Sequence, residues 1–141
     1  MRNAFFLFFS FALTSCASTT GIVQGKLCYP SEYIPAMNVY LKANGSNIIY
    51  KLVSKENDQT FSFKKIPEGN YVAYAYTIDA TMLDLNNKKS KASGGFSHFV
   101  PCGLSVDCKD HSLISFKVNK GKTTNAIDIC DWYGAVVPAE K

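Results

Sequence analysis

Alternating apolar and polar side chains mark residues 37–43 as a strand. The apolar members, Val39, Leu41 and Ala43, alternate with Asn38, Tyr40 and Lys42. A period of two places the two sets on opposite faces of an extended chain, which is typical of a strand with one buried face. The pattern therefore predicts a half-buried strand here.

Similar runs recur between turn-forming clusters. They predict further strands at residues 22–29, 48–55, 60–64, 71–77, 113–118 and 124–130. We expect the last two to form a hairpin across the turn at 119–122. Gly25, inside the first strand, predicts a bulge or a close backbone approach. About seven short strands and no long helical period predict an all-β fold, an antiparallel β-sandwich of Ig-like or prealbumin-like type.

Residues 78–112 interrupt this regular spacing. A connection of this length usually carries function or local structure of its own. It contains Cys102, Cys108, both histidines and the pair Gly94-Gly95. We expect a long disulfide-containing loop within one domain at residues 22–133, followed by a C-terminal tail at 134–141.

The order of several motifs resembles one known family. The motifs are GIVQGK at 21–26, IPAMNVYL at 34–41, FSF at 61–63 with IPEGNY at 66–71, and the segment from Val118 to Ile129. Together they resemble the carboxypeptidase regulatory-like (prealbumin-like) domains, which are related in fold to starch-binding-like, carbohydrate-binding-like domains. The resemblance implies a seven-stranded sandwich in an accessory or adhesion module, with no catalytic residues to transfer. The 78–112 segment and the cysteines depart from that family's pattern.

The first residues predict an exported protein. Arg2 precedes an apolar run at 4–13, which is too short to span a bilayer as a helix. Leu13-Thr14-Ser15-Cys16 then resembles the lipobox of bacterial lipoproteins. We expect removal of the signal peptide 1–15, acylation of Cys16 with diacylglyceryl and palmitate-like chains, and a short tether at 16–21. The alternative is an ordinary signal peptide followed by a chance cysteine.

The predicted location and the net charge of the chain limit the kinds of partner that we expect. Ala17 is not the aspartate that retains enterobacterial lipoproteins in the inner membrane, so the outer membrane is favoured in a Gram-negative source. The net charge is +4, yet Arg2 is the only arginine. Because nucleic-acid recognition favours arginine, we expect a membrane partner through the lipid anchor and no nucleic acid.

With Cys16 acylated, four cysteines remain. An even number in an exported chain indicates two disulfides, with three possible pairings. Strand parity directs Cys28 and Cys130 away from the core, so their pairing would join the first strand to the last. Cys102 and Cys108 would then close a small loop. The alternative is a zinc site of His98, Cys102, Cys108 and His111, but its spacing differs from the usual paired-cysteine pattern. We expect no metal and no cofactor.

Two aromatic segments follow Cys28 and Cys130. If those cysteines bond, Tyr29, Tyr33, Trp132 and Tyr133 meet at one end of the sandwich. Such a cluster can stack on a sugar or anchor a protein, and the alternative is that the rings pack over the disulfide.

No nucleophile elbow or paired carboxylates stand out, so an enzyme is not expected. The function predicted is a lipid-anchored cell-envelope binding module for a glycan or protein partner. A structural lipoprotein of an envelope complex is the alternative. An inhibitor of a secreted hydrolase, inserting the 78–112 loop, is a special case of the first.

Overall fold

The computed structural model describes residues 19–79, 82–83 and 87–140. The predicted signal peptide, the predicted lipobox and Cys16 lie outside these residues. In the described part the chain is all-β, without a helix, so no helix long and apolar enough to cross a membrane occurs there. Ten strands are found instead of seven: β1 (Thr20–Lys26), β2 (Met37–Ala43), β3 (Ile49–Val53), β4 (Thr60–Pro67), β5 (Gly69–Thr77), β6 (Met82–Leu83), β7 (Lys89–Ser90), β8 (Ser93–Gly95), β9 (Phe116–Val118) and β10 (Thr123–Thr124).

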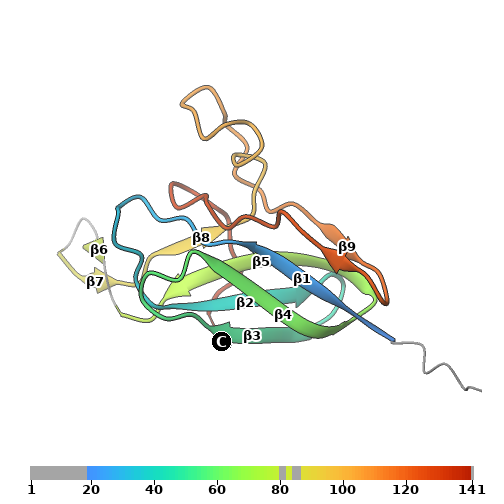
Figure 1. Ribbon diagram of the computed structural model, residues 1–141. Helices are drawn as coiled ribbons and strands as arrows, with labels where there is room; N and C mark the ends of the chain where they lie inside the picture. Colours follow the sequence, from blue (N-terminus) through green and yellow to red (C-terminus); the bar gives the residue numbers. More distant parts are fainter. Residues whose placement is uncertain (1–18, 80–81, 84–86, 141) are drawn as a thin grey trace, which may run out of the picture.

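Two sheets form the body of the molecule (Figure 1). The smaller has the order β10-β1-β4, and the larger has the order β3-β2-β5-β8, with β9 also pairing with β5. Their pairing is antiparallel except between β1 and β10, which run parallel. A separate short hairpin joins β6 to β7.

The core lies between the two sheets. Val23, Phe61 and Phe63 come from the smaller sheet, and Val39 and Leu41 from the larger. All five are buried, as the period-two pattern of β2 and β4 predicts. The residues after β10 complete the core with Ile127 and Ile129.

Gly25 makes a close backbone approach, as its position in β1 predicts. A Cβ built on this residue would lie 1.9 Å from the backbone oxygen of Ile127. Here the chain after β10 passes along β1, where Ile127 N donates to Gln24 O and Ile129 N donates to Lys26 O. Only a residue without a side chain fits between these two segments.

The hairpin expected between residues 113–118 and 124–130 is wrong. β9 pairs antiparallel with β5 in the larger sheet, whereas β10 pairs parallel with β1 in the smaller one. The turn at 119–122 therefore carries the chain from one sheet to the other. Its anchor is the edge of β1, where Gly121 N donates to Thr20 O at 2.9 Å and Ile22 N donates to Lys122 O at 3.0 Å.

Residues 78–112 are not one loop. They include β8, which pairs with β5 between Tyr74 and Gly95 and extends the larger sheet. Gly94 and Gly95 are buried because Trp132 covers the first and Leu113 the second. Because neither glycine has a side chain, Trp132 and Leu113 can pack directly against the backbone of β8.

The C-terminal residues cover the outer face of the larger sheet. Tyr40 and Tyr74 stack there with ring centroids 5.1 Å apart, and both are almost completely buried. Glu140 accepts hydrogen bonds from Asn38 Nδ2 and Tyr40 Oη and forms an ion pair of 2.7 Å with Lys91. Tyr76 Oη adds a bond to Pro138 O at 2.9 Å.

We expect Tyr40 to ionise only near pH 12. Its burial, followed by the hydrogen bond and the charge of Glu140, raises the pKa of Tyr40 to about 12. Because the folded pKa exceeds the usual value near 10.0, this stabilisation is complete below pH 10 and is lost as the pH rises to 12.

An ultraviolet titration of tyrosine ionisation measures this transition. Glu140→Gln should shift it to lower pH, and the exposed Glu32→Gln should leave it unchanged. A Tyr40 transition near pH 10 in the unsubstituted protein would contradict the expectation.

Candidate functional site

Two disulfides organise the region around the predicted aromatic cluster. Cys28 pairs with Cys130 and Cys102 pairs with Cys108, the pairing favoured by strand parity. The first bridge joins two neighbouring segments, the one after β1 and the one after β10, since Cys28 N also donates to Ile129 O at 3.1 Å. It joins residues 102 apart in sequence, a span for which the loss of chain entropy in the unfolded state gives about 4.7 kcal/mol of stabilisation.

The four aromatic residues predicted to cluster lie in three different places in the structure. Tyr29 packs edge-on against Trp132, with centroids 5.1 Å apart. Tyr133 is 65% exposed and points to another neighbour, Phe99, at 6.0 Å. Tyr33 is 51% exposed and lies beside Glu56, whose hydrogen bond and charge raise the pKa of its hydroxyl. The structure thus brings together Tyr29 and Trp132, but Tyr33 does not join them.

Trp132 has a packing role. Its ring lies directly over Gly94, where an added Cβ would come within 2.5 Å of Trp132 Cδ2. The indole Nε1 is buried, and no described group accepts a hydrogen bond from it. Tyr29 and Trp132 therefore fit the interpretation in which aromatic rings pack beside the disulfide.

A groove of about 540 Å³ lies beside Tyr133. Most of its lining comes from the loop of residues 97–112, which projects above β8 in Figure 1. We call it the loop groove. Seven residues line it: Phe99, Leu104, Val106, Cys108, Lys109, His111 and Tyr133. Of these, Val106 is 85% exposed and Leu104 is 42% exposed.

The small disulfide shapes this loop. The backbone of Gly103 has φ +103°, and Leu104 follows at φ 56°, so the chain reverses direction immediately after Cys102. Glycine is suited to the first of these positions because it carries no Cβ. Leu104 N then donates to Phe99 O, and Cys108 N to Ser105 O. The reversal places Leu104 and Val106 at the surface of the groove.

The buried Asp131 contacts two of the residues that line the groove. Its side chain is fully buried, and Oδ2 accepts from Ser97 Oγ at 2.6 Å and lies 2.8 Å from His111 Nδ1. Because a carboxylate only accepts hydrogen bonds, Nδ1 is the protonated nitrogen of this contact. Oδ1 accepts from the backbone N of Tyr133 at 3.1 Å. One buried carboxylate thus holds two groove residues, while Phe99 stacks on the His111 ring at 4.4 Å.

Ser97, His111 and Asp131 are not arranged as a Ser-His-Asp catalytic triad. Ser97 and His111 both contact the same Asp131 oxygen, so the imidazole does not lie between the hydroxyl and the carboxylate. Ser97 is also fully buried. The three side chains form a structural hydrogen-bond network.

The alternative zinc site is not formed. Cys102 and Cys108 are bonded to each other, and the described residues contain no group of three or more His, Cys, Asp or Glu side chains able to hold a metal.

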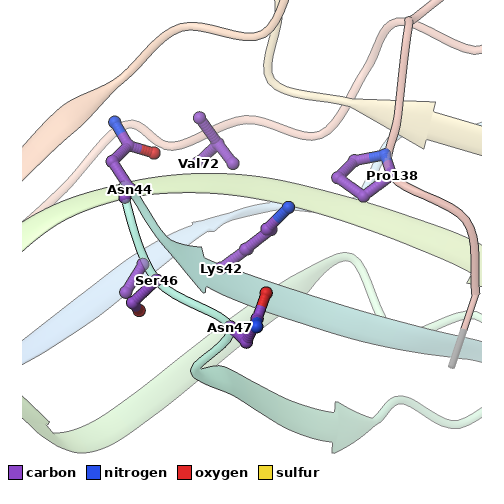
Figure 2. A pocket seen from close by; sticks show the side chains of 8 residues that line it. Lys42, Asn44, Ser46, Asn47, Val72 and Pro138 are labelled. Carbon is purple, nitrogen blue, oxygen red and sulfur yellow. The ribbon is translucent and has the colours of Figure 1, made fainter.

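A second concavity, of about 410 Å³, lies on the outer face at the β2–β3 turn (Figure 2). Lys42, Asn44, Ser46 and Asn47 line it, together with Val72 and Pro138. Figure 2 shows the turn side chains pointing in different directions. Asn44 already donates to Ser115 Oγ, and Ser46 Oγ accepts from Ile48 N. These contacts stabilise the turn, so we place the candidate site at the loop groove.

Sequence reasoning identified Tyr133 but missed Phe99, Leu104, Val106 and Lys109. The available signal was the pair of exposed aliphatic residues enclosed by two closely spaced cysteines. Comparison with protein-family models, curated proteins and solved structures found no match.

Proposed function

We propose that this protein is a non-enzymatic binding module, anchored by a lipid on Cys16 to the outer membrane of a bacterial cell envelope. Its sandwich is of the prealbumin-like type suggested by the motif order, and it serves as the rigid support for the 97–112 loop. The partner is a protein that inserts an apolar side chain into the loop groove. An enzyme inhibitor of the inserting-loop kind is one form that such a module takes.

The exposure of Val106, Leu104 and Tyr133 around one groove carries this proposal. Large apolar side chains that are exposed together mark interaction sites, whereas single ones are ordinary. The disulfide and the Asp131 contacts fix the loop before binding, which reduces the entropy lost on association.

A protein partner fits the groove better than a glycan. Sugars are bound by a flat aromatic ring with several polar groups that converge on their hydroxyls. Here two of the exposed lining residues are aliphatic, and none of the seven lining residues carries a carboxylate.

The test is site-specific photo-crosslinking in intact cells. A photoreactive side chain at position 106 should form an adduct of defined mass, and the same side chain at Val53, which is 61% exposed on β3, should not. Val106→Ser with Tyr133→Ala should weaken capture of that partner by at least roughly 30-fold, as expected for residues that dominate an interface.

The matched control is Val53→Ser with Tyr33→Ala, which removes the same side chains elsewhere. Equal capture by both double variants would contradict the proposal. Mass analysis without reduction must show both disulfides in each variant. If the groove captures a glycan in place of a protein, the groove remains the binding site but the proposed protein partner is wrong.

A further inference from the structure

The end of the sandwich where β1 begins carries a cluster of lysines. A concavity of about 340 Å³ lies there, lined by Thr20, Gly21, Ile22, Lys64, Lys65, Gly121, Lys122 and Thr123. Lys120 precedes Gly121 in the same turn, and all four lysines of this end are exposed. We call Lys64, Lys65, Lys120 and Lys122 the basic end.

Backbone pairing explains why these lysines gather. On one side of β1, Gly21 pairs with Ile66 and Val23 with Phe63, and a register shift leaves Lys64 and Lys65 both opposite Ile22. Lys65 has φ 59°, as expected at such a bulge. On the other side, Ile22 N donates to Lys122 O. The first residues of β1 therefore run between Lys64 and Lys65 of β4 on one side and Lys122 of the 119–122 turn on the other.

These charges are not neutralised within the described residues. The ion pairs found there are Lys91 with Glu140 and His111 with Asp131, and neither involves the basic end. Glu68, in the turn between β4 and β5, is the acidic residue nearest in sequence to Lys64 and Lys65, and it is also exposed. Four lysines against one glutamate leave this end with a net positive charge.

We propose that the basic end docks on the anionic phospholipid headgroups of the membrane that carries the Cys16 lipid, which rests on the anchoring proposed above. Thr20, the first residue of β1, comes only four residues after Cys16 in the sequence, so the acyl chains hold this end at the headgroups. A basic patch beside a lipid anchor supplies a second attachment to an anionic surface. Lysine ammonium groups from two separate segments suit many separate phosphates better than one convergent phosphate site.

The docked orientation directs the loop groove away from the bilayer. β1 runs from Thr20 at the basic end to Lys26, a length of about 20 Å at the usual rise per residue. Cys28 lies at the far end, where its disulfide to Cys130 leads to Asp131 and the groove. The lipid surface and the partner therefore meet opposite ends of β1.

Vesicle binding of the full chain with Cys16→Ser tests the patch without acylation. The probes are phosphatidylcholine vesicles with and without phosphatidylglycerol, because the neutral vesicles measure any contribution from residues 1–15. Binding to the anionic vesicles should fall roughly fivefold for each lysine removed, and on the order of a hundredfold for Lys64→Gln, Lys65→Gln and Lys122→Gln together.

The matched control is Lys55→Gln with Lys88→Gln and Lys89→Gln. These three lysines are exposed: Lys55 follows β3, Lys88 precedes β7, and Lys89 is the first residue of β7. In Figure 1, β7 and the end of β3 lie at the opposite end of the molecule from the start of β1. The proposal is overturned if the two triple variants bind anionic vesicles equally, or if inorganic phosphate at constant ionic strength displaces the protein. If mass analysis finds no acyl chain on Cys16 of the native protein, the proposed lipid anchor is wrong, whereas vesicle binding by the basic end is judged separately.

Discussion

Gly25→Ala should lower the free energy of unfolding by about 3 kcal/mol or more, at the upper end of what overpacking usually costs. The new Cβ would lie 1.9 Å from Ile127 O and 2.5 Å from Ile127 C, and both are backbone atoms that cannot move by a change of rotamer. Relief requires β1 and the segment after β10 to separate. That separation would break the bonds from Ile127 N and Ile129 N to β1.

Denaturant unfolding measures the effect, and Gly45→Ala is its control. Gly45 has φ +72° and nothing within 4 Å of an added Cβ, so alanine there meets only backbone strain of about 1 kcal/mol. Gly25 has no such positive φ, so its cost comes from contact alone. If the two variants unfold at the same denaturant concentration, the close approach of the two segments is wrong.

The prediction for Gly25 illustrates which part of the fold the sequence determines. The boundaries of one strand followed from its local pattern: residues 37–43 form β2 with the boundaries that alternation predicts. Val39 and Leu41 face the core, as their parity indicates. A glycine inside a strand likewise signals a close approach without indicating which segment approaches.

Long-range pairing was less accessible. Two strand-like segments separated by a short turn favour a hairpin, yet β9 and β10 belong to different sheets because β1 and β5 offer each of them an edge. Tyr40 gave a similar difficulty. Its polar-face parity predicts exposure, but the C-terminal residues cover it and Glu140 accepts its hydrogen bond. Neither contact has a local signature.

The candidate site was predictable only through the cysteines. Their pairing correctly brought the segments of Tyr29 and Trp132 together, because a covalent bond between two strand ends also holds the neighbouring residues close to each other. Tyr33 was assigned to the same cluster by nearness in sequence alone, and the chain turns it toward Glu56. The groove required the tertiary contact between Tyr133 and Phe99, which joins segments that no sequence pattern relates.

Asp131→Ala should have a second large effect, lowering the free energy of unfolding by about 3–5 kcal/mol. The substitution leaves three donors, Ser97 Oγ, His111 Nδ1 and Tyr133 N, without their acceptor, at about 1–3 kcal/mol for each donor that stays buried. Asp131→Asn retains one acceptor oxygen and should cost less. Both values come from denaturant unfolding with the disulfides intact.

The same residue connects stability to the proposed binding. Because Asp131 holds His111 and the backbone of Tyr133, its loss should also weaken partner capture in protein that remains folded. A double-mutant cycle of Asp131→Ala with His111→Ala isolates their direct coupling. Additive effects within about 0.5 kcal/mol would show that the carboxylate does not position the imidazole, and would separate the groove from the buried network.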